Sequence, residues 1–269
     1  MITLTALYRI FVYPIFNDDV TVYEYADKWL LPNIWYIIIP LALYYKSIGW
    51  LQEYMEERPK FILKRFLIVW NASLVMLSLF GFLNLGLESY LIYWSHETFP
   101  EFICSRKVIL RKVHYWAILI NISKFVEFGD TYLLILQKKP VPFIHWFHHM
   151  SVTFLTFYLF ANQDPTARYF GTVNTFVHTI MYSYFAINSV GIKINAVIKV
   201  SITLLQLLQM FIGIFISTCG YIYCNNRTIG TSYASFLTYA VYIYLFGEFL
   251  IKSIKRTFYS SQAKKQRYN

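Results

Sequence analysis

Three histidines, His145, His148 and His149, lie close together at the start of an apolar stretch. On an α-helix, residues three and four positions apart share a face, so the three imidazole rings are predicted to point the same way. A neutral imidazole can act as a nucleophile or bind a metal ion, and ionisable groups within apolar segments are costly. The cluster therefore predicts a site of chemistry.

The preceding apolar segment carries charged and polar residues at helical spacing. Lys124, Glu127, Asp130 and Thr131 follow one another at offsets of three, three and one, which places them along one helical face. Each charge would cost roughly 2.5 to 3.5 kcal/mol if it faced lipid. We therefore expect the stripe to face protein or a water-filled cavity. A purely structural ion pair between Lys124 and Glu127 is the alternative.

Two later apolar segments also carry polar stripes. The first stripe consists of Asn174, His178, Met181 and Tyr182, and the second of Lys199, Thr203, Gln206 and Gln209. Consecutive helices with one polar face each are expected to form a closed ring around an interior chamber. Counted at about 1.5 Å per residue, His148, Asp130 and His178 fall at a similar depth and are expected to meet in one site.

The elements that must position these residues are membrane helices. The chain of 269 residues is 57% hydrophobic, 20% aromatic and only 14% charged, which excludes an ordinary soluble domain. Most of its apolar segments approach the ~20 residues that a spanning helix needs. The segments are residues 29–45, 66–87, 113–136, 146–161, 169–191, 196–224 and 232–251. We predict one all-α, multi-pass membrane domain over residues 1–269, with seven transmembrane helices.

The net charge of +10 reflects membrane orientation more than a nucleic-acid partner. The cationic residues lie mainly in short segments between the apolar runs, as expected where positive charge sets orientation, and no nucleic acid is expected. Placing the C-terminus in the cytosol collects most of these residues on the cytosolic side.

The opposite, lumenal side then receives a glycosylation candidate, Asn226, in the triplet that ends at Thr228. It also receives Cys104, on the same side as Cys219 and Cys224. An oxidising lumen would allow Cys104 to pair with Cys224 or Cys219.

Two chemistries compete for the histidine cluster. Membrane di-iron oxygenases and desaturases use several histidine boxes, whereas this chain has six histidines, of which His96 and His114 lie elsewhere. The ligands are too few for a di-iron site, and we predict no metal site, with a single zinc ion as the alternative. Alternatively, a neutral imidazole attacks a thioester and forms an acyl-imidazole that a carbon nucleophile then accepts. Asp130 or Glu127 would fix the tautomer, and an oxyanion would be held by Asn174 or His178.

Four motifs in this order resemble those of the ELO family of very-long-chain fatty-acid elongases. They are Ser123–Thr131 (SKFVEFGDT), His145–His149 (HWFHH), Asn174–Tyr184 (NTFVHTIMYSY) and Thr203–Gln209 (TLLQLLQ). The histidine box alone is a weak signal, whereas the ordered set is specific.

The resemblance implies an acyltransferase, a very-long-chain 3-oxoacyl-CoA synthase. Such an enzyme condenses a long-chain acyl-CoA with malonyl-CoA to 3-ketoacyl-CoA, CO2 and CoA, with no cofactor besides these substrates. His148 would carry the acyl group, His145 and His149 would support it, and His178 would position the thioester or stabilise the enolate. Asp130 completes the expected catalytic set.

The resemblance also implies surroundings for the site. The fold would place helices two to seven in a ring around an acyl tunnel, with the first helix outside. The polar chamber would comprise Lys124, Glu127, Thr131, Asn174, Tyr182, Gln206 and Gln209, and candidates for the CoA phosphates are Lys138, Lys139, Lys252 and Lys255. The expected location is the endoplasmic reticulum membrane, with membrane lipid, the other enzymes of the elongation cycle and a second copy of the chain as partners.

Two other functions remain open from the residues alone. A metal-dependent membrane lipid oxygenase or desaturase predicts bound iron. A non-catalytic seven-helix lipid-binding protein predicts that His148 is dispensable.

Overall fold

The computed structural model describes residues 32–110, 112–192, 194–224 and 229–266, with the side chains of residues 256–266 left undescribed. Within these ranges the regular structure is helical and no strand is present. The helices are α4 (Trp35–Met55), α5 (Lys64–Trp94), α6 (Phe99–Cys104), α7 (Lys112–Val126), α8 (Phe128–Leu136), α9 (Phe143–Ala161), α10 (Ala167–Val190), α11 (Ala196–Tyr223) and α12 (Ile229–Gln266). The prediction of an all-α protein is confirmed for the described residues.

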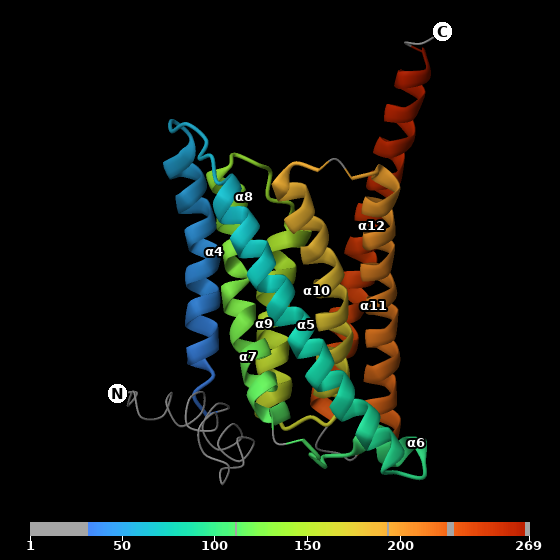
Figure 1. The fold of residues 1–269 in the computed structure, drawn as a ribbon. Helices are drawn as coiled ribbons and strands as arrows, with labels where there is room; N and C mark the ends of the chain where they lie inside the picture. The colour runs from blue at the N-terminus through green and yellow to red at the C-terminus, as the bar shows by residue number, and fades with distance from the viewer. Residues whose placement is uncertain (1–31, 111, 193, 225–228, 267–269) are drawn as a thin grey trace.

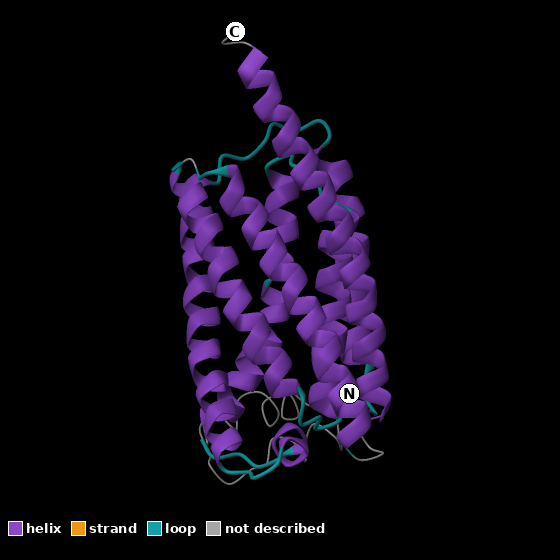
Figure 2. Cartoon of the chain, turned by 90° about the vertical axis from the view of Figure 1, so that its right-hand side faces the viewer, coloured by secondary structure: helices purple, strands orange, loops and turns teal. Residues whose placement is uncertain are grey.

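The long helices run side by side in one bundle (Figure 1). The short helix α6 lies at one end, and α12 projects beyond the other end toward the C-terminus, as a second view also shows (Figure 2). We call these the α6 end and the C-terminal end. Contacts between neighbours lead from α5 to α7, α9, α12, α11 and α10 and back to α5, whereas α4 packs on α8 and α9.

In the part of the chain that the structure describes, three helices are long and apolar enough to cross a membrane: Lys64–Trp94, Ala196–Tyr223 and Ile229–Lys255. Large apolar side chains on their outer faces, including Val69, Leu204 and Leu237, are more than half exposed. An apolar exterior of this extent suits lipid rather than water. The protein is therefore a membrane protein.

Several helix boundaries differ from the predicted segments. The first segment was expected at residues 29–45, but α4 begins at Trp35 and continues to Met55, while residues 29–31 lie outside the described ranges. The last helix extends from the expected end at residue 251 to Gln266. Helix propagation adds one hydrogen bond per residue, so a helix continues past the end of its apolar pattern into polar sequence.

The segment expected as one helix at residues 113–136 is divided at Glu127 into α7 and α8. Around this break the backbone hydrogen bonds remain local, with the amide of Glu127 bonded to Ser123 O and that of Asp130 to Glu127 O. The interruption of the regular helix falls at a charged residue of the predicted stripe.

The α6 end has a polar and covalent framework. Glu88 is fully buried and accepts hydrogen bonds from the amides of Ile109 and Leu110, at 2.7 and 2.8 Å. Arg168 lies 3.8 Å from the Glu88 carboxylate. Of the two cysteine pairings left open by the sequence, the structure has Cys104–Cys224, and Cys219 is free and buried. Asn226 lies outside the described residues.

Candidate active site

A cavity of about 410 Å³ lies inside the bundle, between the middle of the helices and the C-terminal end. Its walls come from α5, α8, α9, α10, α11 and α12. The predicted site residues that line it are Asp130, His145, His148, His149, His178, Tyr182, Gln206 and Lys139. Residues from four separate sequence motifs or their flanks are thus brought to one space.

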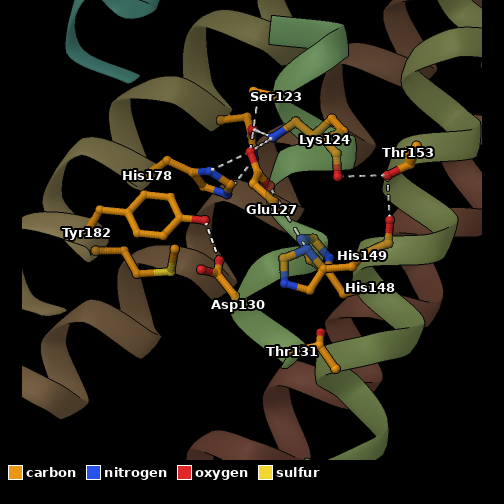
Figure 3. Close-up of polar contacts among 12 residues, drawn as sticks. Ser123, Lys124, Glu127, Asp130, Thr131, His148, His149, Thr153, His178 and Tyr182 are labelled. Carbon is orange, nitrogen blue, oxygen red and sulfur yellow. Dashed lines mark hydrogen bonds and ion pairs between the residues drawn. The ribbon is translucent and has the colours of Figure 1, made fainter. Parts of the chain in front are cut away.

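Lys124, Glu127 and Asn174 are buried and form a polar layer next to this cavity. Figure 3 shows Lys124 and Glu127 directed at each other. The Lys124 ammonium group donates to Glu127 Oε1 and to Asn174 Oδ1, at 2.9 Å each. Asn174 Nδ2 lies 3.3 Å from His178 Nε2. The Lys124–Glu127 ion pair considered from the sequence is therefore present, and it is also connected to a histidine of the cavity wall.

Glu127 lies between two histidines. Its Oε1 is 3.7 Å from His178 Nδ1, and its Oε2 is 4.0 Å from His149 Nδ1. Its Oε1 also accepts the Ser123 hydroxyl at 3.3 Å. Because Glu127 occupies the break between α7 and α8, one carboxylate reaches both the histidine box on α9 and the histidine of α10.

The histidine box projects from the first turns of α9, which follows the N-cap residue Pro142. The His145 and His149 ring centroids are 4.7 Å apart, and those of His148 and His149 are 5.9 Å apart. The predicted common face is therefore formed.

Four buried polar atoms in this cluster have no hydrogen-bond partner among the described residues: Glu127 Oε2, His145 Nε2, His148 Nδ1 and His149 Nδ1. Buried polar atoms are nearly always paired, and exceptions in native structures call for an explanation. Here, several unpaired atoms gather beside a cavity, as expected of groups that interact with a substrate. Among the described residues, no three His, Cys, Asp or Glu side chains are arranged to hold a metal ion.

The sequence model of the ELO family, GNS1/SUR4, matches residues 29–266. This chain belongs to the ELO family. Very long chain fatty acid elongase 3 of Homo sapiens is 32% identical over 241 residues, which cover 86% of this chain and 88% of that protein. Very long chain fatty acid elongase 6 of Drosophila melanogaster is 32% identical over 250 residues, which cover 88% and 78%. Putative fatty acid elongase 4 of Caenorhabditis elegans is 28% identical over 232 residues, which cover 83% and 79%.

The resemblance found in the sequence motifs is thus confirmed, and this ELO protein is an enzyme of fatty-acid elongation. The structure does not bring every predicted site residue to the cavity of the ELO protein. Thr131 faces α4, where its hydroxyl lies 2.6 Å from the Tyr44 hydroxyl, and Gln209 is buried away from the cavity wall. The spacing of polar residues predicts which side chains share a helical face, but it does not predict which neighbouring helix or cavity that face contacts.

Of the lysines predicted to contact CoA, only one lines the cavity. Lys139 lines the cavity, whereas the Lys138 ammonium donates to the backbone oxygen of Glu56 at 2.9 Å. Lys252 pairs with Glu248 one turn earlier on α12, and Lys255 does not line the cavity. Lys199, which begins the polar stripe of the predicted segment at residues 196–224, does line it.

Aromatic residues of the ELO site were missed by sequence reasoning. Tyr242 and Phe246 of α12 pack on the His148 ring, with centroids 4.8 and 5.8 Å away. The Tyr242 hydroxyl lies 2.6 Å from Ser151 Oγ and thereby ties α12 to the helix that carries the box. In an apolar segment with so many aromatic residues, no spacing distinguishes these two.

Proposed function

We propose that this ELO protein catalyses the condensing step of elongation, as a very-long-chain 3-oxoacyl-CoA synthase. It would join a long-chain acyl-CoA to malonyl-CoA through an acyl group carried on His148. The observation that supports this most directly is the position of His148, in the cavity wall with Nδ1 buried and unpaired among the described residues.

In the first half-reaction, a ring nitrogen of neutral His148 attacks the thioester carbon of acyl-CoA. The carbon–sulfur bond breaks, and the imidazole proton passes to the departing thiolate, so CoA leaves as a thiol and a neutral acyl-imidazole remains. His145 and His149 flank the attacking ring, while Tyr242 and Phe246 hold its far side.

In the second half-reaction, malonyl-CoA loses CO2 and the resulting enolate carbon attacks the acyl carbon. The bond to His148 breaks, 3-ketoacyl-CoA forms, and the imidazole takes up one proton. His178 would orient the malonyl thioester, because its ring lines the cavity while Asn174 and Glu127 contact its two nitrogens.

The fold proposed for this reaction has seven membrane spans, with α4 outside and the remaining spans ringed around an acyl tunnel. The closed order of helix contacts supports the ring. A second cavity of about 290 Å³ lies toward the α6 end, beyond the Lys124–Asn174 layer, and supports a path for the acyl tail. Each methylene buried there would contribute about 0.8 kcal/mol.

CoA is proposed to bind at the C-terminal end of the catalytic cavity. Lys139 and Lys199 line this part of the wall and are the cations placed to meet its phosphates. Lys138 and Lys252 are bonded to Glu56 and Glu248 instead, which favours Lys139 and Lys199 as the phosphate contacts.

The proposed location is the endoplasmic reticulum membrane, with the C-terminus in the cytosol. A disulfide needs an oxidising compartment, so Cys104–Cys224 supports a lumenal α6 end, and CoA would then enter from the cytosol at the opposite end. The other enzymes of the elongation cycle and a second copy of the chain are the proposed partners.

The mechanism is tested by supplying the purified protein with acyl-CoA alone and with labelled malonyl-CoA. We expect intact-mass analysis to find one acyl group on the native protein, mapped to His148, and labelled 3-ketoacyl-CoA when both substrates are present. His148→Ala should lose both products, whereas His96→Ala, at the α6 end, should keep them. Condensation by His148→Ala at the native rate, or tightly bound iron needed for activity, would refute the proposal.

A further inference from the structure

The carboxylate of Asp130 is held from two sides by helices far apart in the sequence. The indole Nε1 of Trp70, on α5, donates to Oδ1 at 2.6 Å, and the hydroxyl of Tyr182, on α10, donates to Oδ2 at 2.8 Å. Figure 3 shows the Tyr182 hydroxyl directed at Asp130. Both carboxylate oxygens are thus occupied, which suits an anchor better than a group that must exchange protons with a substrate.

Trp70 is fixed in this position by a close fit to Gly129. A Cβ atom at residue 129 would lie 2.6 Å from Cη2 and from Cζ2 of the Trp70 ring, well inside the contact distance of two carbon atoms. Phe66 stacks on Trp70 with ring centroids 5.9 Å apart. Glycine at 129 therefore lets the indole cross to α8 and reach the neighbouring Asp130.

Tyr182 connects this anchor to the proposed malonyl site. Its side chain is only 1% exposed, and its ring meets the His178 ring edge-on, at 5.4 Å between centroids and an interplanar angle of 86°. Asn174 and Glu127 already contact the two nitrogens of His178. The Tyr182 ring supplies the remaining support that sets the plane of the imidazole.

We propose that Trp70 is a positioning residue for the second half-reaction, acting through Asp130 and Tyr182 on the ring of His178. In this proposal Asp130 accepts hydrogen bonds from both Trp70 and Tyr182, and Gly129 leaves the space that the indole ring occupies. The inference rests on the proposed role of His178 and makes a prediction that the proposed function alone does not. Loss of the Trp70 N–H should slow condensation while leaving acylation of His148 intact.

Trp70→Phe tests this, because it keeps an aromatic ring beside Gly129 and removes the donor. The two half-reactions are measured separately, as the rate of acyl-protein formation with acyl-CoA alone and the rate of 3-ketoacyl-CoA release after malonyl-CoA is added to the acyl-protein. We expect the first rate to stay within about twofold and the second to fall roughly tenfold or more, as for a lost hydrogen bond to a charged group. Trp50→Phe, on the exposed face of α4, is the matched control and should keep both rates.

Two further variants address the same chain of contacts. Tyr182→Phe keeps the ring against His178 and removes the other donor to Asp130, so it should show the same selective loss. Because both donors act through one carboxylate, Trp70→Phe with Tyr182→Phe should lose less than the product of the single losses. If Trp70→Phe fails to fold, Tyr182→Phe alone decides the question.

Equal losses in both half-reactions, or unchanged rates in Trp70→Phe and Tyr182→Phe, would overturn the inference. These outcomes are distinct from a failure of the proposed function. If the native protein condenses its substrates without forming an acyl-protein, the mechanism on His148 fails. If the native protein does form it and the variants keep both rates, only the role of Trp70 fails.

Discussion

Lys124 on α7 and Asn174 on α10 are 50 positions apart in the sequence, yet a hydrogen bond of 2.9 Å joins their side chains. Lys124 is only 2% exposed to solvent and also forms an ion pair with Glu127. This contact links the ionic stripe of one helix to the histidine of another.

Replacing Lys124 with Met should destabilise the fold strongly. The change leaves the buried Glu127 carboxylate without its cation, at an expected cost of about 3 to 5 kcal/mol. Adding Glu127→Gln should recover much of this loss, because removing both partners leaves no uncompensated charge. Thermal unfolding in detergent measures Lys124→Met, Glu127→Gln and the double variant, and additive losses would contradict the buried pair. Activity should be lost in all of them.

Gly213→Ala should force α11 and α12 apart. A Cβ atom at Gly213 would lie 2.5 Å from Cδ1 of Tyr239, whose ring stacks on Phe170. Overpacking of this kind costs about 1 to 3 kcal/mol. Gly247→Ala is the matched control on α12, since no atom lies within 4 Å of its added Cβ, and it should be neutral or stabilising by up to about 1 kcal/mol. Equal unfolding temperatures for the two variants would argue against the close helix contact.

Lys139→Gln and Lys199→Gln should raise KM for acyl-CoA with little change in kcat. Both side chains line the cavity near its C-terminal end, and a lost phosphate contact weakens substrate and transition state alike. The rise in KM should shrink at high salt, which screens exposed charges. Lys138→Gln is the control, because its ammonium is bonded to the Glu56 backbone instead. An increase in KM for Lys138→Gln as large as for its neighbour would contradict this assignment.

Loss of the Cys104–Cys224 disulfide should lower stability by about 2 to 4 kcal/mol, since the bond closes a long loop in the unfolded chain. The two cysteines are 120 residues apart in the sequence, and the bond between them joins α6 to the end of α11. Cys104→Ser should unfold at the same lower temperature as the reduced native protein. Cys219→Ala should keep a disulfide-dependent transition, because Cys219 is free. Should reductant leave the native transition unmoved, the disulfide does not stabilise the fold.

Local spacing was sufficient to predict the faces that carry the site. The offsets of three and four in the histidine box and in the third segment predict a common face for His145 and His149 and an inward face for Asp130, and these three side chains line the cavity, because helical periodicity depends only on neighbours in the chain. The capping box of α6, formed by Thr98 and Glu101, is likewise a local pattern, although it lies between the predicted apolar segments.

What depends on distant packing could not be predicted. Trp70, Tyr242 and Phe246 carry no distinguishing spacing in a chain that is 20% aromatic, and their roles appear only when α5 and α12 lie beside the cavity. Lys138 and Lys139 are adjacent and chemically identical, yet only Lys139 lines the cavity. Lys138 lies in a backbone turn, with φ of 52°, and its ammonium group bonds to Glu56 at the end of α4.

By itself, the sequence determined that this chain is a helical membrane protein of the ELO family, because composition, apolar length and ordered motifs are properties of residue order alone. Only the tertiary structure decided which side chains share the cavity, that Cys224 rather than Cys219 pairs with Cys104, and that Trp70 holds Asp130. The physical reason is that periodicity sets the face of a helix, whereas the rotation and depth at which two helices pack are set by the shapes of all the side chains between them.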